Sequence, residues 1–147
     1  MKKDIKCLTA FFIRKYGTNN PFEIARSLGI EVFKVPLGEI SGYYKYQKKH
    51  KCIFINSELE DMYFMRLVMA HELGHAIMHS KENCYFLEHH TLMLTNKNEV
   101  EANRFAVNLL ISDDELSDYK EFTVDQISRI TGYGMKLIEL RMKDYGR

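Results

Sequence analysis

Two histidines and a glutamate stand together in the middle of the chain, in the segment HELGH at residues 71–75. In an α-helix, residues four apart lie one turn apart on the same face, so both imidazoles can reach one metal ion. Glu72 then projects beside them, where a carboxylate can accept a proton from a water that zinc activates. The spacing predicts a zinc site at His71 and His75, with Glu72 as the general base of a hydrolase.

A catalytic zinc ion usually takes three protein ligands, so a third must come from elsewhere in the chain. His79 continues the helical stripe, but it lies ~12 Å along the axis from His71, too far for the same ion. We expect His79 to support a ligand instead. Glu99 is the better candidate, because it shares a helical face with Asn103, which can support a ligand. Glu101 lies ~200° around the helix from Glu99 and is expected to face solvent.

Two segments resemble the ImmA/IrrE family of metallopeptidases, small zincin-like proteins often encoded on mobile elements. Residues 71–79, HELGHAIMH, resemble the family's HELGHxxxH, and residues 99–110 resemble its ExEANxFAxxLL. Residues 21–32 resemble the family's usual helix–Gly–strand entry. The chain departs from the family pattern at Ile111-Ser112, where Met-Pro is typical.

The resemblance implies His71, His75 and Glu99 as zinc ligands and Glu72 as general base. It also implies a protein substrate, a helix-turn-helix repressor whose cleavage releases mobile-element or stress genes. A non-proteolytic regulator that binds a repressor or DNA around a structural zinc site is the alternative. Three protein ligands favour catalysis, because structural zinc usually has four.

The apolar pattern predicts the elements that position these residues. The HELGH segment falls in a helix that starts after Ser57 and runs to about residue 80, and residues 98–111 form the next helix. Upstream we expect helices at residues 4–16 and 22–28 and strands at residues 30–35, 40–47 and 52–55. Between the two motif helices we expect a loop at residues 81–97. The fold class is α+β, a zincin-like domain with a small, mainly antiparallel three-stranded sheet.

Residues 112–147 read as two or three short helices that cap the same domain, so that residues 1–147 form a single domain. Residues 122–142 have the look of a helix-turn-helix, with Thr123 as N-cap. Lys136, Arg141 and Lys143 could contact DNA, but acidic residues are interleaved with them. We therefore expect a covering role and no direct nucleic-acid binding.

Composition excludes several classes of protein. The 147 residues carry a net charge of +1, which excludes a polyanion binder that works through bulk charge. No apolar run approaches the ~20 residues of a membrane span. The N-terminal apolar run is bounded by charges and reads as a helix, not a signal peptide. Three widely spaced cysteines suit a reducing compartment, so we expect a cytoplasmic protein without membrane contact.

The sequence leaves several features of the predicted enzyme open. These are the scissile bond, the activation signal, the oligomeric state and the donor that stabilises the oxyanion. The candidate donors are Tyr43, Tyr44, Tyr85, His89 and His90. The substrate is expected to add as a strand beside the second or third strand of the sheet.

Overall fold

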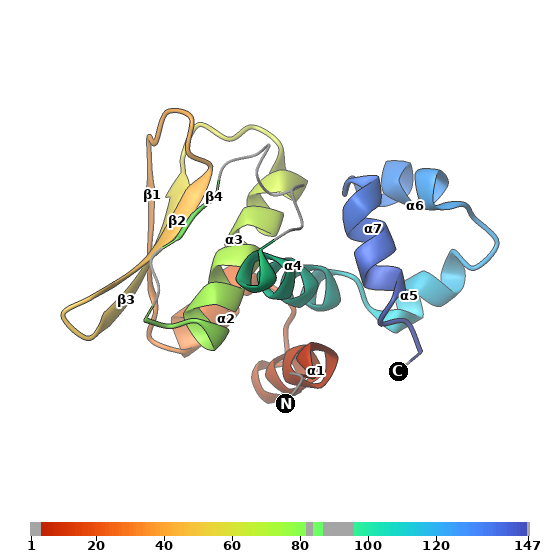
Figure 1. The fold of residues 1–147 in the computed structure, drawn as a ribbon, viewed down its shortest axis with the longest axis horizontal. Coiled ribbons are helices and arrows are strands. Elements are labelled where there is room, and N and C mark those ends of the chain that lie inside the picture. The colour runs from red at the N-terminus through yellow and green to blue at the C-terminus, as the bar shows by residue number, and fades with distance from the viewer. Residues whose placement is uncertain (1–3, 82–83, 87–95, 147) are drawn as a thin grey trace.

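The computed structural model describes residues 4–81, 84–86 and 96–146. In Figure 1 the sheet lies on one side of the central helix α3, and the three C-terminal helices group together beyond α4. The elements, in chain order, are α1 (Ile5–Tyr16), α2 (Pro21–Ser27), β1 (Glu31–Val35), β2 (Gly42–Gln47), β3 (His50–Asn56), α3 (Met62–Met78), β4 (Cys84–Phe86), α4 (Lys97–Leu110), α5 (Asp113–Asp118), α6 (Val124–Thr131) and α7 (Met135–Met142).

The sheet has the strand order β1-β3-β2-β4. Strand β1 pairs in parallel with β3, whereas β2 pairs antiparallel with both β3 and β4. The hairpin between β2 and β3 turns at Lys48 and Lys49, whose φ angles of 51° and 66° suit a tight two-residue turn. The three expected strands are confirmed, and the α+β class with them.

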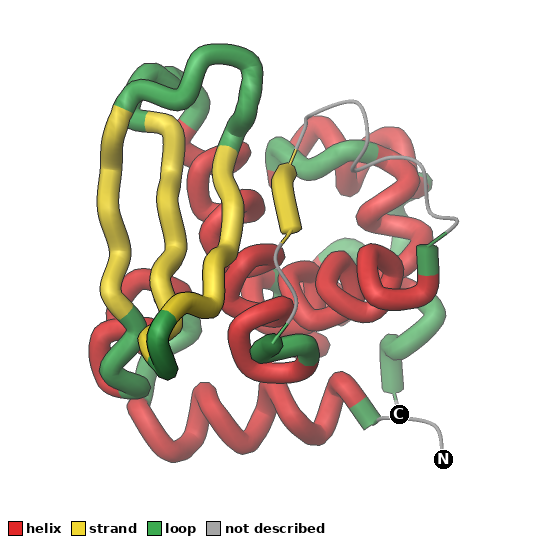
Figure 2. Tube along the Cα trace, turned by 60° about the vertical axis from the view of Figure 1, so that its left-hand side comes forward, coloured by secondary structure: helices red, strands yellow, loops and turns green. Residues whose placement is uncertain are grey.

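Two expectations about the sheet are wrong. A fourth strand, β4, lies in the segment expected to be a loop, and Figure 2 shows it as a short strand at the edge of the sheet. Three residues are too few to display the alternation by which a strand is recognised. In addition, β2 and β3 are both interior strands, so neither offers the edge predicted for the substrate.

Helix α3 lies between the sheet and α4. Tyr44, Ile53 and Ile55 point from the sheet into the core and are fully buried. The helix itself is buried from Leu67 to Ala76 on all of its faces, as expected of a central helix. It contacts β2, β3 and β4 on one side and α4 on the other.

Helix α3 begins later than expected. Its N-cap is Asp61, whose carboxylate accepts hydrogen bonds from the backbone N–H groups of Tyr63 and Phe64. Ser57 is not the cap, because Asn56 holds the chain there in a turn: its Oδ1 accepts from the N–H of Glu58. Aspartate caps as well as serine does, so the local sequence alone does not separate the two starts.

The C-terminal helices pack on α4 through α7. Thr123 is the N-cap of α6, as predicted, and forms a reciprocal capping box with Gln126. Arg141 is only 1% exposed and donates hydrogen bonds to the carbonyl of Ile111 and to Asp113. It is therefore not available to DNA, whereas Lys136 and Lys143 are exposed; the covering role stays a prediction.

None of the helices within the described ranges combines the length and apolar character that crossing a bilayer requires.

Candidate metal centre

Three side chains from α3 and α4 bring their ligand atoms together. His71 Nε2 lies 3.1 Å from His75 Nε2 and 2.9 Å from Glu99 Oε2, and His75 Nε2 lies 3.0 Å from Glu99 Oε1. In the part of the chain that the structure describes, this is the one group of three such residues whose ligand atoms all lie within 4.8 Å of one another. The two imidazoles are buried and the carboxylate is partly exposed.

The chemistry of this group fits a zinc ion. Two imidazole nitrogens and one carboxylate form a common donor set of catalytic zinc sites. Asn103 Oδ1 lies 2.8 Å from His71 Nδ1 and accepts a hydrogen bond from its N–H. A neutral His71 held in this way presents its Nε2 lone pair to His75 and Glu99. Burial raises the pKa of Glu99, but the adjacent His71 and His75 rings outweigh this and hold it below its ordinary range. The carboxylate is therefore anionic, as a ligand must be.

Local structure explains how α4 presents Glu99. Asn96 is the N-cap of α4, and its side chain accepts hydrogen bonds from the backbone N–H groups of Asn98 and Glu99. Glu99 therefore sits in the first turn of α4. The helix axis then carries Asn103 one turn further along the same face, where it meets His71.

A glycine allows the two helices to approach closely. A Cβ at Gly74 would lie 3.1 Å from the Cβ of Phe105, which is fully buried in α4. Because Gly74 stands between His71 and His75 in α3, this contact brings the ligand side of α3 against the helix that carries Glu99.

The supporting residues differ in one respect from the prediction. His79 Nδ1 lies 3.1 Å from His75 Nδ1, away from the proposed ligand atoms. Glu101 was expected to face solvent, and this is wrong: it is only 9% exposed, and its Oε1 lies 2.8 Å from His79 Nε2. Glu101 is buried because it contacts His79 at the C-terminal end of α3. In the sequence, the second glutamate of the ExEAN segment is the feature that could have indicated this buried contact.

The remaining predicted residues fall into three groups. Glu72 is fully buried in α3, directly after His71. Tyr44 also lies in the core and donates its hydroxyl proton to the carbonyl of Ser80, whereas Tyr43 stacks on Phe54 at the opposite face of the sheet. His89, His90 and the side chain of Tyr85 lie outside the described part of the chain.

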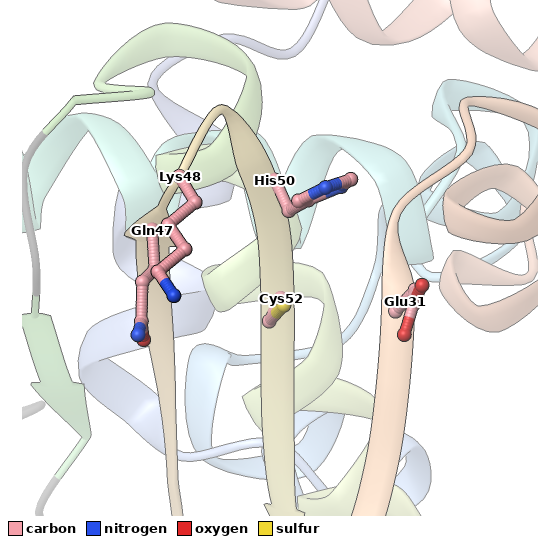
Figure 3. A pocket seen from close by; sticks show the side chains of 5 residues that line it. All are labelled: Glu31, Gln47, Lys48, His50 and Cys52. Carbon is pink, nitrogen blue, oxygen red and sulfur yellow. The ribbon is translucent and has the colours of Figure 1, made fainter.

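A separate pocket lies on the open face of the sheet (Figure 3). Its lining residues are Glu31, Gln47, Lys48, His50 and Cys52. Cys52 alternates along β3 with the buried Ile53, so the pocket faces away from α3 and is no part of the metal centre.

Comparison with known proteins identifies the family of this chain. The family model described as the IrrE N-terminal-like domain, of peptidase family M78, matches residues 25–142. The "Uncharacterized immunity region protein 2" of Bacillus phage phi105 is 44% identical over 140 aligned residues, in a match that covers 93% of this chain and 88% of the phage protein. "Metallopeptidase ImmA" of Bacillus subtilis (strain 168) is 33% identical over 118 residues, which are 79% of this chain and 68% of that protein. The chain therefore belongs to the ImmA/IrrE family of metallopeptidases.

Proposed function

We propose that this chain is a zinc-dependent endopeptidase that cleaves a helix-turn-helix repressor in the cytoplasm and so releases the genes of a mobile element. The observation that carries the proposal is the convergence of His71 Nε2, His75 Nε2 and the Glu99 carboxylate. The name of the phage relative, an immunity region protein, is in keeping with a substrate encoded by a mobile element. A peptidase of this family requires a protein substrate, and the repressor is our assignment of it.

In the proposed mechanism, His71, His75 and Glu99 would hold a zinc ion. When bound, that ion would supply a Lewis acid able to activate water and polarise the scissile carbonyl. Glu72 accepts the proton of the attacking water as the new C–O bond forms. It then delivers that proton to the amine nitrogen as the C–N bond breaks, which completes the hydrolysis.

We assign the substrate-binding edge of the sheet to β4. An extended peptide can pair with an exposed strand edge through main-chain hydrogen bonds. The two edge strands of the described sheet are β1 and β4. Strand β4 contacts α3, the helix of the HELGH segment, whereas β1 contacts α2, so a peptide on the β4 edge runs nearer to the metal centre.

The test is co-expression with helix-turn-helix repressors of mobile elements as candidate substrates, with wild-type protein and with Glu72→Gln. The amide has the shape of the carboxylate but cannot accept the proton, so we expect zinc to remain bound and cleavage to fall ~10²–10⁴-fold. Glu139→Gln makes the same change at an exposed position of α7 and should cleave normally. If the repressor stays full length with wild-type protein while wild type and Glu72→Gln derepress its genes equally, the protein is a binding regulator.

A further inference from the structure

A row of buried polar side chains extends from the metal centre on the side away from Glu99. His75 Nδ1 lies 3.1 Å from His79 Nδ1, and His79 Nε2 lies 2.8 Å from Glu101 Oε1. The exposed fractions of His75, His79 and Glu101 are 2%, 8% and 9%. Polar groups at such depth are costly unless each hydrogen bond is made, so the positions of the protons in this row matter.

Binding of zinc through His75 Nε2 determines where those protons lie. A neutral His75 that uses Nε2 as a ligand carries its proton on Nδ1 and donates it to His79 Nδ1. His79 must then carry its own proton on Nε2, and it donates this proton to the Glu101 carboxylate. Because Glu101 Oε1 accepts this hydrogen bond, Glu101 favours the direction of the row that leaves the Nε2 lone pair of His75 facing the ion.

We propose that Glu101 is a positioning residue that acts through His79 to hold His75 in its zinc-binding tautomer; this rests on the proposed function, in which His75 is a ligand. Carboxylates that fix a metal-bound histidine directly are common, and they also raise the basicity of the ligand. Here the carboxylate acts one imidazole further away. His71 has the shorter version of the same arrangement, because Asn103 contacts its Nδ1 directly.

The variant that tests the proposal is Glu101→Gln. Glutamine keeps the shape of the side chain, but its amide can also donate a proton to His79 Nε2. His79 then carries its proton on Nδ1, facing the Nδ1 proton of His75, and the zinc-binding tautomer is disfavoured. We expect zinc affinity, measured by competition with a chelator, to fall ~10- to 100-fold, and the visible absorption spectrum of the Co²⁺-substituted protein to change. Glu139→Gln, at the exposed position of α7, should change neither.

The second part of the test asks whether Glu101 acts through His79. In His79→Asn, the amide oxygen lies near the place of Nδ1 and accepts directly from His75, and the side chain is too short to reach Glu101. We therefore expect Glu101→Gln to change zinc affinity less than ~2-fold when it is added to His79→Asn. An equal loss in both backgrounds would overturn the proposal. So would a Glu101→Gln protein that loses thermal stability without zinc while keeping normal zinc affinity, because its role would then be structural.

Two further outcomes separate this inference from the proposed function. If Glu101→Gln does not fold, His79→Ala and His79→Asn take its place: the proposal requires His79→Ala to bind zinc more weakly than His79→Asn, and equal affinities overturn it. Wild-type protein that binds zinc while Glu101→Gln binds it equally well contradicts only the positioning role. Wild-type protein that binds no zinc contradicts the proposed function, and the positioning role with it.

Discussion

His71 and His75 each turn Nε2 toward Glu99 and Nδ1 toward a supporting side chain. The support for His71 is Asn103, at 2.8 Å, and the support for His75 is His79, at 3.1 Å. Because both rings are held at the far nitrogen, their near nitrogens are oriented before any ion arrives. If these rings are metal ligands, as proposed, they would lose little freedom on binding, which would favour tight association with the metal.

At the scale of single residues, we predict that Glu99→Ala weakens zinc binding far more than Glu101→Ala. Glu99 lies within 3.0 Å of both imidazole nitrogens and is proposed to donate an electron pair to the ion, whereas Glu101 contacts His79. Zinc content after dialysis and chelator competition measure the difference, with Glu139→Ala as the control. Equal losses, or a larger loss with Glu101→Ala, would show that the wrong carboxylate is assigned as the ligand.

At the scale of elements, the site depends on how closely α3 and α4 pack. The three proposed ligands come from both helices, so a small change in the separation of the helices moves Glu99 relative to the histidines. Gly74 and Phe105 meet at this interface, and Phe105 is fully buried among the core residues. Its Cβ is attached to the backbone of α4 and cannot rotate out of the way.

We therefore predict that Gly74→Ala destabilises the protein and weakens zinc binding. The new methyl group would lie 3.1–3.2 Å from atoms of Phe105, and overpacking of this kind costs about 1–3 kcal/mol. The higher helix propensity of alanine offsets about 1 kcal/mol of that cost. Urea unfolding measures the net loss in the free energy of unfolding, which we expect to be up to about 2 kcal/mol.

Gly134→Ala is the matched control for this prediction. It adds the same methyl group where no heavy atom lies within 4 Å, and the φ of −63° suits any residue. We expect it to change stability by less than about 1 kcal/mol and to leave zinc binding unchanged. If Gly74→Ala is as stable as wild type, α4 can move at little cost and the close packing is not required.

At the scale of the whole molecule, ion pairs join the N-terminal helix α1, the helix α4 that carries Glu99, and the C-terminal end of the chain. Arg104 of α4 donates two hydrogen bonds to the buried carboxylate of Asp144. Lys6 of α1 donates to Asp113 and to the carbonyl of Asp144, and Arg141 of α7 also donates to Asp113. The C-terminal helices are thereby tied to the helix that carries Glu99, on the side away from the sheet.

The ion pairs of Asp113 predict a specific dependence of stability on pH. Burial raises the pKa of Asp113, but the hydrogen bonds from Lys6 and Arg141 outweigh this and hold it below its ordinary value of 3.8. A folded-state pKa below the unfolded one stabilises the protein above pH 3.8, and this stabilisation is lost as the pH falls through the folded-state value. Wild type should therefore be more stable than Asp113→Asn at pH 7, and the difference should shrink below pH 3.8.

Urea unfolding of both proteins between pH 7 and pH 3 measures this difference in the free energy of unfolding. Because the carboxylate is about one-third exposed, with a side-chain exposure of 37%, solvent screening keeps the effect modest. Asp118→Asn makes the same change at an exposed acid of α5 and is the matched control. A difference between wild type and Asp113→Asn that is constant down to pH 3 would contradict the assigned pairing.

The sequence by itself determined the features that depend on neighbours along the chain. Helical geometry places residues four apart on one face, so the pairing of His71 with His75 could be predicted without any tertiary information. The same holds for the N-cap at Thr123 and for the family, which two short motifs identified. Glu99 required one further step, because its place beside Asn103 on a helical face says which carboxylate is suitable but not what it contacts.

Tertiary structure alone decided the features that depend on contacts between distant segments. Glu101 meets His79 across 22 residues and Arg141 meets Ile111 across 30, so nothing in the local pattern of either residue shows that it is buried. The strand order and the short strand β4 depend likewise on which segments pair across the sheet. Helical periodicity predicts which side of a helix a residue occupies, but the packing of other elements decides whether that side faces solvent, core or a metal centre.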